Sequence, residues 1–174
     1  MTLLMNPAPS THAAFENPAF ENPNGFGPHL MLDCRRCNPE KLGDVAHIFN
    51  VLNELPEKIG MTKITQPYVF PYSGLVPEDK GVTGMVVIAE SHLSFHSFTE
   101  KDYFFFDLFS CKPFDVEAAM RYVVEAFDAQ DVELHYVERG RHFQRSEIPA
   151  SPAQPLQNVV PLHEAEPVPM MATL

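Results

Sequence analysis

The residues with the clearest chemical potential lie between positions 81 and 111, in the stretch "GVTGMVVIAESHLSFHSFTEKDYFFFDLFSC". Glu90 and Ser91 stand at the junction of two apolar, strand-like runs, and His96 and Cys111 follow. A hydroxyl, an imidazole and a thiol are side chains that enzymes use as nucleophile, base and proton donor. Whether they can act together depends on how the strands around them pair.

The polar residues 99–102 predict a turn between two aromatic strands. Residues that face each other in an antiparallel hairpin have numbers with a constant sum. A turn centred on this tetrad therefore places Ser91 opposite Ser110, and Glu90 opposite Cys111. The thiol thus arrives beside the Glu90-Ser91 bond.

The preceding hairpin turns near Glu90, and its register places Thr83 opposite His96. Five residues separate Ser91 from His96, which is roughly 16 Å at ~3.3 Å per residue. Their odd spacing also directs them to opposite faces of the strand. Two interpretations stay open: unrelated polar residues of the core, which the pattern alone favours, or a His96 that serves Ser91 of a second subunit related by a two-fold axis.

Other candidate sites are weaker. Cys34 and Cys37 form a single CxxC pair, whereas a zinc site would need a second pair. A redox pair would need a helix that begins after the first cysteine, but Asn38-Pro39 starts the helix after the second. We interpret both as structural thiols. The histidines are scattered, so no metal site is expected, and neither a Gly-rich phosphate loop nor a Ser-His-Asp signature is present.

Hydrophobic periodicity and capping residues predict the elements that position these groups. The expected strands cover residues 28–35, 62–70 (interrupted by Pro67), Val82–Ala89, His92–Phe98, Tyr103–Ser110 and 132–140. One helix is expected from Asn38 to Pro56, with Leu42, Val45, Phe49 and Leu52 on one face. A second helix is expected to be capped by Asp115. Consecutive strands joined directly predict a largely antiparallel sheet with helices on one face. The expected fold class is an α+β two-layer sandwich.

The chain has 174 residues, enough for one domain with a proper core. Its 17 prolines crowd toward both ends. We therefore expect flexible Pro-rich tails at residues 1–26 and 149–174, around a folded domain at 27–148.

The net charge of −11, spread along the chain, argues against nucleic acid or an anionic membrane surface as a partner. No stretch approaches the ~20 apolar residues that a membrane span requires. The N-terminus lacks a basic region followed by an apolar run, and three cysteines do not suit a disulfide framework. These features predict a cytoplasmic protein.

Taken together, these segments resemble a known family. The stretch "GVTGMVVIAESHLSFHSF…DLFSC" is similar to the bacterial and archaeal S-adenosylmethionine decarboxylase proenzymes. Their pattern runs G-V-S-G, an apolar strand, E-S-H-x-[ST]-x-H-[ST]-W-P-E, then D-x-[FY]-[ST]-C. The similarity extends to "GPHLMLDCRRC" near the start and "VERGR…IP" near the end, so it covers nearly the whole expected domain.

The resemblance implies a cofactor that the chain makes from itself. The hydroxyl of Ser91 would attack the carbonyl of Glu90, and an elimination would then cleave the bond between them. The products would be chains 1–90 and 91–174, with a pyruvoyl group at the new N-terminus. A strained turn suits this chemistry, because strain helps an amide carbonyl accept a neighbouring hydroxyl.

The resemblance also implies roles for three further residues. His96 matches the family's base for the elimination. Thr83 matches a hydroxyl, usually Ser, that steadies the ester-forming intermediate. Cys111 matches the proton donor of the decarboxylation.

For the substrate, the resemblance implies S-adenosylmethionine, whose α-amine would form a Schiff base with the pyruvoyl carbonyl, the electron sink of the reaction. The product supplies the aminopropyl group for spermidine synthesis. Glu100 aligns with the acid that binds the ribose hydroxyls, and Phe98 stands where a Trp commonly stacks on the adenine.

This chain departs from the family pattern in the loop before Gly81, where the family often carries a Phe. The segment "PYSGLVPEDKG" has no aromatic residue after Tyr72. Tyr68, Phe70 or Tyr72 would have to replace it, or the contacts to adenine are altered.

Family members are homodimers of processed protomers that share their active sites, which agrees with the second interpretation of the strand register. Two other functions stay open: the same scaffold acting on a basic amino acid such as ornithine or arginine, which the altered loop permits, and a non-catalytic relative that pairs with an active subunit.

Overall fold

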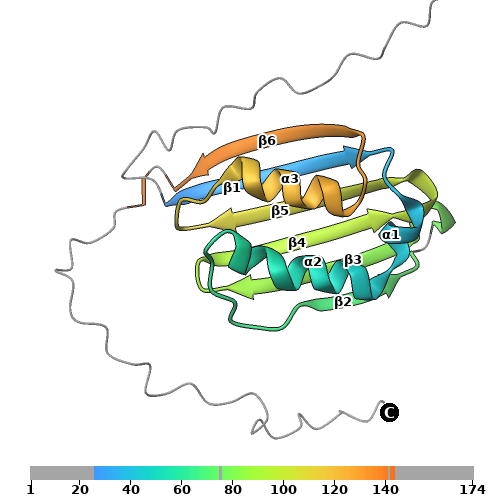
Figure 1. Ribbon diagram of the computed structural model, residues 1–174, viewed down its shortest axis with the longest axis horizontal. Coiled ribbons are helices and arrows are strands. Elements are labelled where there is room, and N and C mark those ends of the chain that lie inside the picture. The colour runs from blue at the N-terminus through green and yellow to red at the C-terminus, as the bar shows by residue number, and fades with distance from the viewer. Residues whose placement is uncertain (1–25, 75, 141, 144–174) are drawn as a thin grey trace, which may run out of the picture. The chain divides into compact units, whose positions relative to one another are not determined.

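A computed structural model describes residues 26–74, 76–140 and 142–143 (Figure 1). Residues 1–25 and 144–174 lie outside it. The predicted tails, and with them the bounds of the domain at 27–148, therefore stay predictions.

In the described part of the chain, six strands form one antiparallel sheet with the order β2-β3-β4-β5-β1-β6. The three α-helices of these residues lie on one face of it (Figure 1). The strands are β1 Gly27–Arg35, β2 Tyr68–Tyr72, β3 Gly81–Ile88, β4 Ser91–Phe98, β5 Tyr103–Ser110 and β6 Asp131–Arg139; the helices are α1 Pro39–Gly43, α2 Val45–Lys58 and α3 Val116–Ala126, and η1 Pro77–Asp79 and η2 Thr99–Lys101 are short 3-10 turns. The predicted α+β two-layer sandwich is confirmed.

The core lies between the helices and the sheet. Every second residue of the central strands is buried there, as the period of a strand requires. Phe95 and Phe104 stack with ring centroids 5.0 Å apart, and both contact Phe127 after α3. The buried apolar residues of the sheet are Leu30, Leu32, Cys34, Val82, Val86, Ile88, Leu93, Phe95, Phe104, Phe106 and Leu108.

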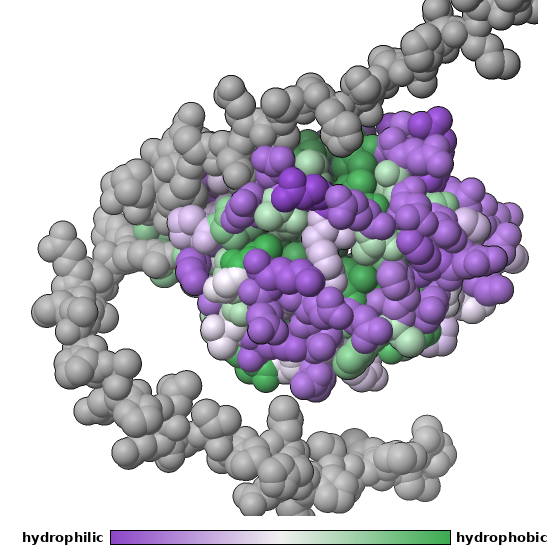
Figure 2. Space-filling model, viewed as in Figure 1, coloured by the Kyte–Doolittle hydropathy of each residue, from purple (hydrophilic) through white to green (hydrophobic). Residues whose placement is uncertain are grey.

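The other face of the sheet has no helix over it in the described part of the chain, and we call it the open face. It carries the alternate residues of the same strands, among them Thr83, His96, Phe105 and Phe109. Several large apolar side chains of the open face are exposed: Tyr68, Phe70, Tyr72, Met85, Val87, Phe105 and Val137. By contrast, Figure 2 shows the helix side, where hydrophilic side chains cover much of the surface.

The predicted single helix from Asn38 to Pro56 is wrong in three respects. The segment forms two helices, because the side chain of Asp44 accepts hydrogen bonds from the N–H groups of Ala46 and His47 and so caps α2. Pro56 does not end α2, which continues to Lys58. The apolar face is also rotated relative to the prediction, since Ile48, Val51, Leu52 and Leu55 are buried but Phe49 only partly.

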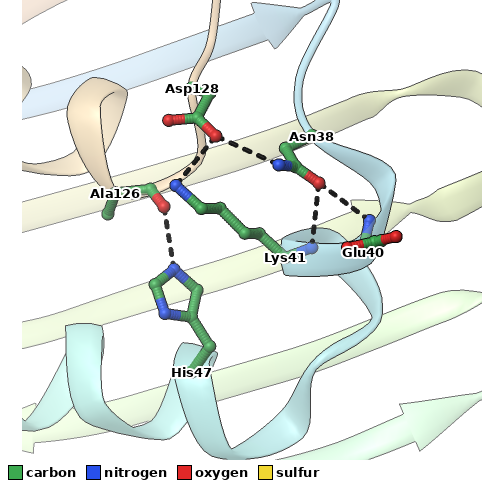
Figure 3. Close-up of polar contacts among 6 residues, drawn as sticks. All are labelled: Asn38, Glu40, Lys41, His47, Ala126 and Asp128. Atoms are coloured by element: carbon green, nitrogen blue, oxygen red, sulfur yellow. Dashed lines mark hydrogen bonds and ion pairs between the residues drawn. The ribbon is translucent and has the colours of Figure 1, made fainter.

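Asn38 caps α1 as predicted, and the same corner joins the helices to the end of α3 (Figure 3). The Asn38 side chain donates to Asp128 at 3.1 Å, and Lys41 forms an ion pair with Asp128 at 2.8 Å. These two contacts hold the pKa of Asp128 below its usual value. The ring of His47 bonds the carbonyl of Ala126 at 2.8 Å.

Two further sequence predictions have different outcomes. Asp115 caps α3, as expected. The strand predicted at 62–70 lies instead at Tyr68–Tyr72, because Pro67 cannot donate to a ladder, although it is an edge strand as expected. Among the described residues no helix is long and apolar enough to span a membrane.

The "GVTG" segment brings β3, β4 and α1 into close contact. A Cβ added at Gly81 would lie 1.7 Å from the backbone oxygen of Ser97. The buried hydroxyl of Ser97 accepts the N–H of Val82 at 2.9 Å and donates to the carbonyl of Leu42 at 2.8 Å. Gly81 thus permits the approach that lets Ser97 fasten α1 to the sheet.

Gly81→Ala is therefore expected to lower the free energy of unfolding by about 2–3 kcal/mol, because the new methyl group forces two backbones apart. Urea denaturation measures this. The matched control is Gly43→Ala, whose Cβ would make an ordinary 3.5 Å contact with Thr99 and which should be neutral or slightly stabilising. Equal stabilities for the two variants would refute this account of Gly81.

Candidate active site

The bond between Glu90 and Ser91 lies in a tight turn from β3 to β4. The carbonyl oxygen of Glu90 accepts a hydrogen bond from the backbone N–H of Cys111 at 2.8 Å. The Glu90 carboxylate accepts another from the N–H of Thr62 at 3.1 Å. Both the carbonyl and the side chain of Glu90 are therefore held from outside the turn.

Ser91 has a backbone φ of 157°, in the positive region that residues with a Cβ rarely adopt. Its hydroxyl lies 3.1 Å from Nδ1 of His92. A strained serine thus directly follows a carbonyl that already receives an N–H donor. That is the arrangement in which a hydroxyl could add to the preceding peptide bond.

Both predicted strand registers are confirmed. Ser91 pairs with Ser110 across β4 and β5, and Cys111 continues this register beside Glu90. Thr83 pairs with His96 across β3 and β4. The sequence therefore located the two polar pairs correctly.

Cys111 is the first residue after β5, and its side chain is half-buried. The hydroxyl of Ser110 bonds both the carbonyl and the N–H of Lys112, at 2.7 and 3.0 Å, and so shapes the turn around the thiol. Cys34 and Cys37 differ, since both are buried next to the helices. Burial raises the pKa of both thiols, that of Cys37 to about 12, which agrees with a structural role.

The second pair lies on the open face. Oγ1 of Thr83 and Nδ1 of His96 are 2.6 Å apart. Burial lowers the pKa of His96, against a smaller opposing effect of Asp79, so the imidazole is neutral at neutral pH. If Nδ1 carries the proton and donates it to Thr83, Nε2 is left as a free base.

Aromatic rings surround His96. The ring centroids of Phe98 and Tyr72 lie 4.7 and 5.8 Å from that of His96. Phe98 also contacts Phe105 and lies under the ammonium group of Lys101. Phe98 is thus part of the open face and not of the core. Of Tyr68, Phe70 and Tyr72, the candidates to replace the family's Phe, Tyr72 has a ring contact with His96.

Glu100 lies in η2, directly after β4, and its side chain is exposed. Nearby, Lys101 and Asp79 form an ion pair at 2.8 Å. This pair fastens the loop before Gly81 to the turn that carries Glu100. The sequence alone did not reveal Asp79, because nothing in a loop of that composition specifies its partner.

The structure brings together Ser91, Glu90 and Cys111 at one end of β4, and Thr83, His96, Phe98 and Glu100 toward the other. Ser91 pairs with residues whose side chains face the core, whereas His96 is on the open face. The two groups do not meet within one chain. Among the described residues no cluster of three or more His, Cys, Asp or Glu could hold a metal ion.

The Cys111 N–H is one functional group that sequence reasoning did not name. The signal for it was present, because the predicted register already placed Glu90 opposite Cys111. What the register could not show was which backbone groups face each other where the ladder ends.

Comparison with known proteins agrees with this geometry. The family model for S-adenosylmethionine decarboxylase matches residues 28–140. An S-adenosylmethionine decarboxylase proenzyme of Pyrococcus abyssi is 32% identical over 116 residues, which cover 66% of this chain and 79% of that protein. One from Thermodesulfovibrio yellowstonii is 32% identical over 125 residues, covering 70% of this chain and 87% of the relative.

A solved structure has the same fold. The crystal structure of the adenosylmethionine decarboxylase from Aquifex aeolicus superposes with a TM-score of 0.59 at 24% identity, covering 67% of this chain and 92% of the other. The residues that the family model matches, 28–140, include every element described above apart from Gly27, the first residue of β1. The chain belongs to the S-adenosylmethionine decarboxylase family.

Proposed function

We propose that this chain cleaves itself between Glu90 and Ser91 and then decarboxylates S-adenosylmethionine, yielding the aminopropyl donor for spermidine synthesis. The observation that carries the proposal is the Glu90-Ser91 junction, where a strained serine follows a carbonyl bound by the Cys111 N–H. Family membership supports the substrate, since the relatives are named for it. No observation favours a basic amino acid as substrate or a non-catalytic role.

The first step is an acyl shift within the chain. The Ser91 hydroxyl adds to the Glu90 carbonyl carbon, the carbon–nitrogen bond breaks, and the freed amine takes up the proton. Charge develops on the carbonyl oxygen during this addition, and the Cys111 N–H is already placed to stabilise it.

The second step is an elimination. A base removes the Cα proton of residue 91, the ester leaves as the carboxylate of Glu90, and a dehydroalanine is left. Water then replaces the nitrogen, which departs as ammonia, and a pyruvoyl group begins the new chain. We assign the base to His96, with Thr83 orienting its ring, because its pKa is lowered and it is therefore neutral.

The pyruvoyl carbonyl supplies an electron sink to which the substrate α-amine can attach. Cys111 remains beside residue 91 after cleavage and can deliver the proton that replaces carbon dioxide. Phe98 and Tyr72 offer aromatic faces to the adenine or to the sulfonium, and Glu100 offers a carboxylate to the ribose.

We further propose a homodimer in which each site is shared. His96 is on the open face, roughly 16 Å along β4 from Ser91, too far to remove a proton from it. A two-fold axis over the open face would bring His96 of one chain to Ser91 of another and cover the exposed apolar side chains. We expect this dimer in the cytoplasm, with neither nucleic acid nor membrane as partner.

Ser91→Ala is expected to remain a single chain of 174 residues, because no hydroxyl is left to attack Glu90. Intact mass of the purified protein measures cleavage and the terminal group together. The control, Cys111→Ala, keeps Ser91 and the backbone N–H. It should still be cleaved to some extent but release carbon dioxide at least ~100-fold more slowly. An active Ser91→Ala protein would contradict the assignment of Ser91 as the nucleophile of the self-cleavage.

Mixed dimers test the shared site. Neither Ser91→Ala nor His96→Ala should be cleaved when expressed alone. When the two are co-expressed with tags of different mass, the His96→Ala chain should be cleaved, since its partner supplies His96, and the Ser91→Ala chain should not. Mass spectrometry of the mixture identifies the cut chain. Absence of cleavage in isolated mixed dimers would show that His96 acts within its own chain or not at all.

The pH dependence of cleavage reports on His96. Only the neutral imidazole is a base, and its pKa lies below the ordinary 6.5. The rate of cleavage of freshly translated chain should therefore stay level from about pH 8 down to 6.5 and fall only at lower pH. Gel analysis of a time course measures this rate. A decline that begins well above pH 6.5 would contradict a neutral His96.

A further inference from the structure

We propose that Arg139, at the end of β6, binds the α-carboxylate of the substrate beside residue 91. This inference rests on the proposed function, because it assigns one more contact in the same site. The substrate is an α-amino acid, so its carboxylate must lie within a few bonds of the amine that attaches to residue 91. A group that recognises this carboxylate should therefore be near the Glu90-Ser91 junction.

The strand register places Arg139 at the same end of the sheet as Ser91, three strands away in the order β4-β5-β1-β6. Arg139 pairs with Gly27 across β6 and β1. On the other side of Gly27, the backbone of β5 passes so close that a Cβ at Gly27 would lie 2.8 Å from Cα of Cys111. Cys111 and Arg139 thus flank a single glycine, and the N–H of Cys111 holds the carbonyl of Glu90.

The guanidinium of Arg139 is held by an aromatic ring. Its central carbon lies 4.0 Å from the ring centroid of Phe109, the neighbour of Ser110. The rings of Phe26, His29 and His92 surround Phe109 at 5.7, 5.5 and 6.0 Å. His92 in turn lies 3.1 Å from the Ser91 hydroxyl, so the stacked cation and the serine share one cluster.

This geometry suits a carboxylate. A guanidinium held over an aromatic ring still has N–H groups in its own plane, and these can bind both oxygens of a carboxylate. Stacking also orders the side chain in advance, which lowers the entropy lost on binding. Arg139 is exposed, so a ligand can reach it from the open face.

The other basic groups nearby are less suited. Burial lowers the pKa of His29, whose Nε2 lies 3.4 Å from Asp107, so it is mostly neutral. Lys112 donates to the carbonyl of Gly60 at 2.9 Å. Arg139 is therefore the group that carries a permanent positive charge in this cluster, in a protein whose net charge is −11.

Carboxylate binding by Arg139 makes a specific kinetic prediction. The contact exists while the substrate is bound and weakens as carbon dioxide departs. Its loss therefore raises KM and does not lower kcat. The decarboxylated product has no carboxylate, so its affinity should not depend on Arg139.

The experiment compares Arg139→Gln with wild type, after intact mass has shown that both are cleaved. KM for S-adenosylmethionine should rise about 10- to 100-fold, as expected for losing a charged hydrogen-bonded contact, with kcat little changed. The inhibition constant of decarboxylated S-adenosylmethionine should stay the same. Arg121→Gln is the matched control, since it removes the same charge from α3 on the helix side.

Two results would overturn the proposal. One is a KM for Arg139→Gln equal to that of Arg121→Gln. The other is an inhibition constant for the product that rises as much as KM, which would show that Arg139 only packs against Phe109. If Arg139→Gln does not fold, Arg139→Lys decides by the same two constants, since it keeps the charge without the paired N–H geometry. A wild-type chain that is uncut or inactive would instead refute the proposed function.

Discussion

The hydrogen bond between the Cys111 N–H and the Glu90 carbonyl is the contact on which the candidate site depends. It exists because β3, β4 and β5 form a continuous antiparallel meander, so that the end of β5 arrives at the turn between the other two strands. The bond fixes the carbonyl of the proposed cleavage site and also places the Cys111 thiol beside it. One backbone contact thus couples the proposed self-cleavage to the proposed proton transfer.

The same strand geometry explains why the site is divided. Alternation along β4 directs His96 to the open face, and the length of a strand separates it from Ser91. Two residues joined by a flexible loop can fold back on each other, whereas an extended strand holds Ser91 and His96 at a fixed separation. The proposed shared dimer would satisfy this constraint, and it would also cover the apolar side chains that the open face exposes.

Around these two groups, ordinary packing sets the positions of the candidate residues. The buried hydroxyl of Ser97 in β4 bonds both β3 and α1, which fixes the strand that carries His96. Phe109 holds Arg139 at the other end of the sheet. Ser97 and Phe109, which also belong to the family pattern, therefore have structural roles. They hold in place the residues to which we assign chemistry.

The sequence by itself determined the fold class, the register of two hairpins and the candidate residues. Turn signals and strand alternation are local, so counting from the two turns was enough to pair Ser91 with Ser110 and Thr83 with His96. Local signals failed where two of them competed, as at Asp44, whose capping side chain divided a helix that the apolar spacing had joined. The tertiary structure alone decided which aromatic residue contacts His96, which loop residue pairs with Lys101, and that Arg139 lies across Gly27 from Cys111. Those contacts join segments distant in the chain, and their distances depend on how the whole sheet twists and packs, which no local pattern encodes.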